Sequence, residues 1–192
     1  MESMVDLVPH PVPHNTGWIE VVSGCMFSGK TEELIRRLRR AKFAKLTVKV
    51  FKPKIDNRYS EDEIVSHSEQ ALPSIMIEKS EDILKLVKDA DIIGIDEAQF
   101  FDANIVSVAV KLAELGKRVI ITGLDMDFRG EPFGPMPTLL AIAEYVTKPK
   151  AICVVCGSPA TMTQRITDSK KTVDVGATDK YEARCRKHHY IP

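Results

Sequence analysis

The chain has 192 residues, of which 44% are apolar and 28% are charged, as is usual for a soluble globular protein with one substantial core and room for a small appendage. Its 27 basic and 27 acidic residues cancel, so the overall charge gives no reason to expect a nucleic-acid partner. No apolar run approaches the roughly 18 residues that a membrane span needs, which argues against a membrane protein.

The N-terminal segment has no recognisable targeting signal. Its first residues, Met-Glu-Ser-Met-Val-Asp, lack the basic and apolar regions of a secretory signal peptide. Residues 1–17 are rich in proline and contain His10 and His14, and they predict a disordered tail without a catalytic role. Without a signal, and with the nucleotide-binding motif that follows, the protein is expected to be cytoplasmic.

A phosphate-binding motif follows. Residues 24–31 match the P-loop pattern G-x-x-x-x-G-K-[ST], between an apolar stretch at 18–22 and a helical pattern at 32–44. Lys30 is expected to reach the β- and γ-phosphates of ATP, and the Thr31 hydroxyl to bind Mg²⁺. The alternative is a strand–helix turn that matches by chance. The loop residues assigned to ATP binding are Gly24, Cys25, Met26, Phe27, Ser28, Gly29, Lys30 and Thr31.

The helix after this motif carries a basic run, Arg-Arg-Leu-Arg-Arg, at residues 36–40. It could be a nucleic-acid patch, but Glu32 and Glu33 precede Arg36 and Arg37 at helical pairing distance. We therefore favour an ordinary solvated helix face, or a contact with a neighbouring subunit.

The rest of the first 149 residues alternates between strand and helix patterns. The predicted strands after the first cover residues 46–51, 72–77, 92–95 and 119–122. Helices are predicted at residues 80–88, capped by Ser80, and at 104–115, ended by Gly116, whereas residues 124–137 carry too many glycines and prolines for regular structure. Apolar strands that alternate with helices predict an α/β fold, a P-loop NTPase-like parallel sheet with flanking helices.

Two acids end one of the predicted strands. Asp96 and Glu97 follow the apolar run at 92–95, as in a Walker B element, and parallel strands place their carboxyl ends beside the ligand. One carboxylate could hold Mg²⁺ and the next could act as a general base, toward water in an ATPase or toward a substrate hydroxyl in a phosphotransferase. The alternative is a pair of surface acids that cap the next helix.

Four further residues have the spacing of a zinc site. Cys153, Cys156, Cys185 and His188 form C-x₂-C and C-x₂-H pairs, a four-ligand set without an open position and therefore structural. The alternatives are unrelated buried thiols or a redox pair, and His189 competes with His188. Cys25 belongs to the P-loop and is not a ligand. A C-terminal lobe, residues 150–192, is too small to be stable without such a metal.

Taken together, these motifs resemble one family. The P-loop, Asp-Asn-Arg-Tyr-Ser at 56–60, Asp-Glu-Ala-Gln-Phe-Phe at 96–101, the segment 123–134 and the zinc pairs are similar to the zinc-containing, cytosolic type of thymidine kinase. The resemblance covers roughly residues 17–192. It implies transfer of the γ-phosphate of ATP to the 5′-hydroxyl of thymidine with Mg²⁺, and a homotetramer. The change of sequence pattern near residues 147–150 predicts a division into a tail (1–17), an ATP-binding domain (18–149) and the C-terminal lobe (150–192).

The resemblance also implies residue roles. Glu97 would be the catalytic base, assisted by Lys30 and by Arg58 as the phosphate-stabilising arginine, and Asp96, Ala98 and Gln99 would complete the ATP site. A "lasso" loop between the zinc pairs would close over the base through backbone hydrogen bonds. The implied substrate-binding residues are Met26, Phe100, Leu124, Phe128, Phe133, Thr163, Thr172, Val173, Asp174, Val175, Gly176 and Tyr181. Of Phe100 and Phe101, one is expected to be plain core.

Two departures from the family pattern stand out. The segment from Arg165 to Val175 is short beside many relatives, and His188 replaces a cysteine of some members, which zinc allows. Two rivals to a thymidine kinase are a kinase for another deoxynucleoside and an ATP-gated binding module, whose basic C-terminal lobe would grip nucleic acid or protein.

Overall fold

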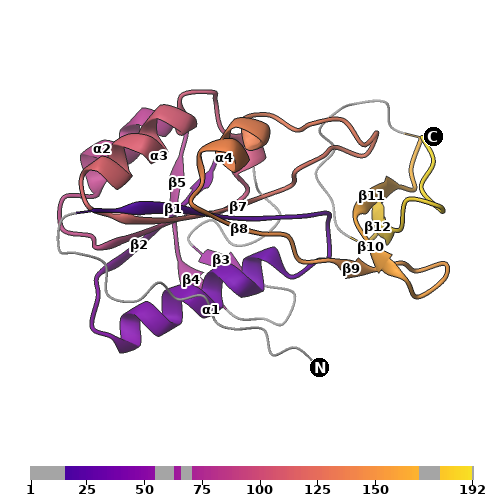
Figure 1. The fold of residues 1–192 in the computed structure, drawn as a ribbon, viewed down its shortest axis with the longest axis horizontal. Coiled ribbons are helices and arrows are strands. Elements are labelled where there is room, and N and C mark those ends of the chain that lie inside the picture. Colours follow the sequence, from indigo (N-terminus) through magenta and orange to yellow (C-terminus); the bar gives the residue numbers. More distant parts are fainter. Residues whose placement is uncertain (1–15, 55–62, 66–70, 169–177, 192) are drawn as a thin grey trace.

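The computed structural model describes residues 16–54, 63–65, 71–168 and 178–191 (Figure 1). Its centre is a six-stranded sheet with the order β5-β2-β6-β7-β1-β8, in which every neighbouring pair is parallel. The strands are β1 (Trp18–Ser23), β2 (Val48–Pro53), β5 (Ile75–Ile77), β6 (Ile92–Ile95), β7 (Arg118–Gly123) and β8 (Tyr145–Thr147). The predicted α/β class with a parallel sheet is confirmed.

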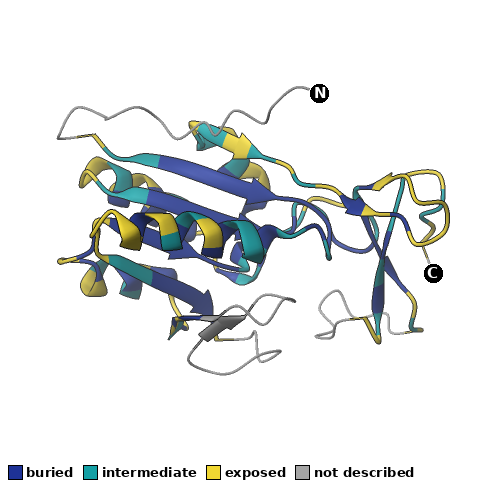
Figure 2. Cartoon of the chain, turned by 90° about the horizontal axis from the view of Figure 1, so that it is seen from below, coloured by how far each residue is buried: buried dark blue, intermediate teal, exposed yellow. Residues whose placement is uncertain are grey.

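Helices cover both faces of this sheet. Figure 1 shows α1 (Lys30–Phe43) on one side and α2 (Ile83–Leu86), α3 (Ile105–Glu114) and α4 (Met136–Ile142) on the other. Side chains along β7 alternate between two apolar clusters: Ile120 packs with α1, whereas Val119 and Ile121 pack with α3. Because both faces are covered, the middle strands are almost entirely buried (Figure 2).

Several predicted elements differ in their bounds. The single strand expected at 72–77 is two strands, β4 (Ala71–Pro73) and β5, and β4 pairs antiparallel with β3 (Glu63–Val65) outside the main sheet. The helix expected at 80–88 is a 3-10 turn, Ser80–Asp82, followed by α2. Ser80 does not cap it, because the Ser80 hydroxyl donates to Asp102 at 2.7 Å instead. The pattern predicted neither α4 nor the edge strand β8.

The predicted end of α3 is confirmed. Gly116 has a φ of 76°, in the left-handed region, and its N–H donates to the Ala113 carbonyl. The Lys117 N–H donates to the Leu112 carbonyl, which completes a Schellman motif. Because the helix ends in this tight turn, β7 begins at Arg118, two residues after Gly116.

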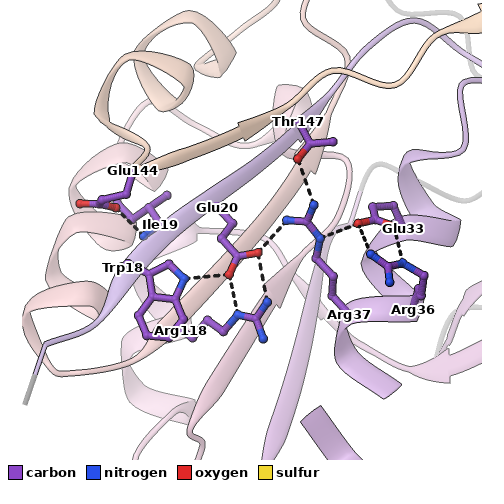
Figure 3. Close-up of polar contacts among 9 residues, drawn as sticks. All are labelled: Trp18, Ile19, Glu20, Glu33, Arg36, Arg37, Arg118, Glu144 and Thr147. Carbon is purple, nitrogen blue, oxygen red and sulfur yellow. Dashed lines mark hydrogen bonds and ion pairs between the residues drawn. The ribbon is translucent and has the colours of Figure 1, made fainter. Parts of the chain in front are cut away.

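The first two arginines of the basic run on α1, Arg36 and Arg37, belong to an ion-pair network (Figure 3). Arg36 pairs with Glu33 at the surface, as expected for an ordinary helix face. Arg37 lies further inward, and its guanidinium also donates to Glu20 on β1 at 2.6 Å and to Thr147 on β8 at 3.0 Å. Arg118 on β7 donates to the same buried Glu20 at 2.5 Å. The network therefore ties α1 to three neighbouring strands.

The chain continues into small antiparallel sheets at one end of the main sheet (Figure 1). β9 (Ala151–Ile152) pairs with β10 (Pro159–Ala160), and β11 (Met162–Arg165) pairs with β12 (Tyr181–Arg184). Residues 1–15, most of the predicted tail, lie outside the described residues. Within the described parts of the chain, no helix combines the length and the apolar character that crossing a bilayer requires.

Candidate active site

The P-loop turns between β1 and α1. Gly29 has a φ of 83°, in the left-handed region that glycine adopts readily, and α1 begins at Lys30. A Cβ on Gly24 would lie 2.6 Å from the carbonyl oxygen of Pro149, so the loop packs too closely on the chain after β8 for any side chain there. The expected strand–loop–helix context of the motif is confirmed.

Lys30 folds back over this loop. Its Nζ donates to the Cys25 carbonyl at 2.8 Å, and the Ser28 hydroxyl donates to the same oxygen at 2.8 Å. Burial lowers the pKa of Lys30, while the carboxylates of Glu97 and Asp96 oppose that shift. A cation held in this position is suited to oxygen anions of a phosphate chain.

Asp96 lies beside the P-loop, as predicted. Its Oδ2 accepts from the Thr31 hydroxyl at 3.4 Å, and its Oδ1 accepts a short hydrogen bond from the Thr122 hydroxyl. Asp96 is buried, and its backbone N–H donates to Phe51 of β2. The Asp96 carboxylate, which follows β6, and the Thr31 hydroxyl, on α1, thus meet at the carboxyl edge of the sheet. Both are hard oxygen ligands of the kind that Mg²⁺ prefers.

Glu97 occupies an unusual backbone conformation. Its φ of 53° is left-handed, which costs a residue with a side chain about 1–3 kcal/mol, and such strained residues cluster at active sites. The residue precedes a 3-10 turn at Ala98–Phe100, but its carboxylate makes no capping bond there. It accepts instead a short hydrogen bond from Gln99, whose Oε1 accepts from the Leu124 N–H at 3.0 Å. The capping alternative for these acids is therefore not supported.

Apolar side chains gather next to these acids. Met26, Leu124, Phe128 and Tyr181 form a buried cluster, with Phe27 and Phe133 packed against it. Phe133 meets Phe100 edge to face, with ring centroids 5.6 Å apart. Phe101 belongs to the core between the sheet and α3, so the expectation that one of the two adjacent phenylalanines is plain core is confirmed.

Strand β11 brings the C-terminal lobe to this site. The Thr163 hydroxyl accepts from the Met26 N–H of the P-loop at 3.0 Å. Two residues further on the same strand, the guanidinium of Arg165 lies 3.7 Å from the centroid of the Phe128 ring. Arg165 is fully buried, and sequence reasoning missed it because an arginine in the polar run Thr-Gln-Arg gives no sign of burial.

The predicted metal ligands come together. The ligand atoms of Cys153, Cys156, Cys185 and His188 all lie within 4.8 Å of one another. The Sγ atoms of Cys156 and Cys185 are 3.8 Å apart, and the His188 Nδ1 is 3.3 Å from the Cys185 Sγ. Zn–S bonds of about 2.3 Å in a tetrahedron require a spacing of this size, so the residues fit a structural zinc.

The structure decides between the two candidate histidines and places Cys25 outside the cluster. The ring of His189 is turned away from the cluster, with its Nε2 2.8 Å from the Phe128 carbonyl oxygen, so His188 is the fourth member. The Cys25 thiol donates to the Ala160 carbonyl and takes no part in the cluster. Arg58 and the predicted lasso, residues 172–176, lie outside the described residues.

Comparison with known proteins fits this geometry. The family model for thymidine kinase matches residues 17–189. This chain belongs to the thymidine kinase family. The thymidine kinase of Rhodothermus sp. (strain ITI 518) is 58% identical over 173 residues, which cover 90% of this chain and 81% of that protein. The resemblance drawn from the sequence motifs is confirmed, and the chain is a member of an enzyme family rather than an ATP-gated binding module.

Proposed function

We propose that this protein transfers the γ-phosphate of ATP to the 5′-hydroxyl of thymidine and so produces dTMP. The observation that carries the proposal is the juxtaposition of three parts at one edge of the sheet. These are the P-loop with Lys30, the acids Asp96 and Glu97, and the apolar cluster that contains Phe128. Family membership supports the choice of thymidine.

Each residue has a distinct role in this proposal. Lys30 and the backbone of the P-loop hold the phosphates, and Glu97 accepts the proton of the 5′-hydroxyl as that oxygen attacks the γ-phosphorus. The bond between the γ-phosphorus and the β,γ-bridging oxygen breaks, and ADP leaves with that oxygen. Thr31 and Asp96 would hold Mg²⁺, which when bound neutralises charge on the β- and γ-phosphates. Arg58 is proposed to stabilise the transferring group, in line with the sequence resemblance.

Aromatic and apolar side chains are proposed to enclose the base. Met26, Leu124, Phe128 and Phe133 pack together, and Phe133 contacts Phe100. These side chains would line the base site, since flat rings suit a stacked pyrimidine. Thr163, Tyr181 and the backbone of 172–176 would add polar contacts. Cys153, Cys156, Cys185 and His188 would hold a structural zinc. Because two of these ligands precede the segment 157–184 and two follow it, the zinc would anchor both ends of that segment.

The proposal extends to the whole protein. We expect a homotetramer in the cytoplasm, with residues 18–149 as the ATP-binding domain, 150–192 as the C-terminal lobe and 1–17 as a tail. Size-exclusion chromatography with light scattering measures the assembly directly. A monomer that is fully active would contradict the tetramer without touching the chemistry.

The deciding experiment is a coupled kinase assay at saturating ATP with four nucleosides: thymidine, deoxyuridine, deoxycytidine and deoxyguanosine. Thymine offers an N3–H donor and an O4 acceptor, whereas cytosine offers the reverse pattern, and each buried polar group left unpaired costs about 1–3 kcal/mol. Thymidine should therefore exceed deoxycytidine by orders of magnitude in kcat/KM, and deoxyguanosine should fail on size. Equal activity on deoxycytidine would identify the rival, a kinase for another deoxynucleoside.

A further inference from the structure

Phe128 lies where the two parts of the molecule meet. It belongs to the irregular segment after β7, and it is buried in the apolar cluster with Met26, Leu124 and Tyr181. Under the proposed function this cluster is the wall of the base pocket. The position of Phe128 therefore affects how well a nucleoside fits.

The ring of Phe128 is held by Arg165. The Arg165 guanidinium carbon is 3.7 Å from the ring centroid, close enough for a stacked cation–π contact. The same guanidinium donates to the Tyr181 hydroxyl at 2.7 Å, and the two residues face each other in the β11–β12 register. Because Arg165 is fully buried among these partners, it has no room to adopt another rotamer without disturbing both rings.

The backbone of Phe128 is held by a second residue of the C-terminal lobe. The Nε2 atom of His189 lies 2.8 Å from the Phe128 carbonyl oxygen. A carbonyl oxygen can only accept, so this histidine carries its proton on Nε2. The preceding residue, His188, points its Nδ1 at Cys185 and Cys153 instead. Of these two adjacent histidines, His188 therefore contacts the Cys/His cluster, and His189 contacts the main chain of Phe128 in the pocket wall.

We propose that Arg165 and His189 are positioning residues that hold Phe128 in place and thereby make the base pocket depend on the C-terminal lobe. Arg165 fixes the ring and His189 fixes the main chain, so both ends of the residue are anchored to the same lobe. Neither residue needs to touch the nucleoside. This inference rests on the proposed function, because it assigns an effect to nucleoside binding.

The first test separates His189 from the metal ligand beside it. His189→Ala removes the hydrogen bond to Phe128, whereas His189→Gln places an amide N–H near the same point and should restore it. We expect His189→Ala to keep about one zinc per chain and to raise the KM for thymidine about 3- to 10-fold, the loss expected for one hydrogen bond. The KM for ATP should stay within 2-fold, and His189→Gln should return the thymidine KM to within 2-fold of wild type.

The second test concerns the ring. Arg165→Met removes the charge and the bond to Tyr181 while keeping similar length, and Arg165→Lys keeps only the charge. Both should raise the KM for thymidine more than the KM for ATP, with the larger effect for Arg165→Met. If that variant does not fold, Arg165→Lys and the His189 pair still decide the matter.

Several results would overturn the inference. They are a thymidine KM unchanged in His189→Ala, an equal rise in both KM values, zinc loss in that variant, or no recovery in His189→Gln. A wild-type protein that phosphorylates none of the four nucleosides would instead refute the proposed function, and this inference with it. Calorimetric titration of thymidine gives the same ranking as a dissociation constant, without relying on turnover.

Discussion

The main sheet and the C-terminal lobe are each stabilised internally in a different way. The sheet is buried between two clusters of large aliphatic side chains, with Leu34 and Leu38 on the α1 side and Ile105 and Leu112 on the other. The lobe has a buried cluster of alanines and cysteines, which also includes Cys25 of the P-loop. Burial of larger side chains contributes more free energy, so we expect the sheet to be self-supporting and the lobe to depend on its Cys/His cluster and on contacts with the sheet.

This difference divides the proposed site. The P-loop, Asp96 and Glu97 belong to the sheet, whereas Thr163, Arg165 and Tyr181 belong to the lobe. Changes in the sheet residues should therefore act on ATP and on the chemical step. Changes in the lobe should act on the nucleoside.

The largest effect is expected at Lys30. Lys30→Ala removes the cation from the P-loop, and phosphoryl transfer should fall below detection because the β- and γ-phosphates lose their counter-charge. Lys42→Ala, at the exposed far end of α1, is the matched control and should keep full activity. Near-normal turnover in Lys30→Ala, measured by the coupled assay, would refute the nucleotide site.

Glu97 should come next. Glu97→Gln keeps the shape and removes the base, so kcat should drop by roughly 10²–10⁴-fold while ATP affinity is largely retained. Glu114→Gln, on the exposed end of α3, is the control. Weaker ATP binding with little change in kcat would mark Glu97 as a metal or structural residue instead.

The metal cluster gives a third prediction. Mass spectrometry of the purified protein should find about one zinc per chain, because four ligands complete a tetrahedral site. Removal of that zinc by a chelator should loosen the lobe and lower activity. A metal-free protein with full activity would show that the lobe is stable without zinc. The lobe and the sheet would then not differ in their need for a metal.

The smallest effect on activity is expected in the network around Glu20 (Figure 3). Burial alone would raise the pKa of Glu20, but hydrogen bonds and charge from Arg118, with help from Trp18 and Arg37, outweigh burial and lower it. Glu20→Gln should reduce the free energy of unfolding by about 1–3 kcal/mol at neutral pH, with both KM values unchanged. Denaturant melts, with Glu114→Gln as control, measure this.

The pH dependence of that loss has a definite sign. A carboxyl whose pKa is lowered in the folded state contributes stability above its unfolded pKa and loses that contribution as the pH falls through the folded pKa. The stability gap between wild type and Glu20→Gln should therefore shrink below pH 4.5, the ordinary pKa of glutamate. A gap that stays constant down to pH 3 would contradict the assignment.

Local patterns with a strong physical cause could be predicted from the sequence. The strand predicted at 92–95 has the bounds of β6, Ile92–Ile95, because a continuous apolar run ended by acids leaves few alternatives. The stop at Gly116 and the three cysteine ligands follow from the sequence for a similar reason, since a left-handed turn and a tetrahedral site demand particular residues. The choice of His188 over His189 as the fourth ligand required the structure, in which His189 faces Phe128.

Features that depend on tertiary contacts could not be predicted in this way. Ser80 looked like a helix cap, but Asp102, far along the chain, takes its hydroxyl. Arg37 looked like a surface residue until Glu20 and Thr147 were brought beside it. The burial of Arg165 follows from the rings of Phe128 and Tyr181, which come from two other segments. The bounds and neighbours of such residues are set by packing, which a periodic pattern does not record.

The division of the site between sheet and lobe is tested most directly by His188→Ala, with ATP and thymidine titrated separately by calorimetry. The variant removes one metal ligand from the lobe and leaves the P-loop and the acids intact. We expect the dissociation constant for thymidine to rise about 10-fold or more, whereas that for ATP should change less than 2-fold. Equal weakening of both ligands, or no change in thymidine binding, would contradict it.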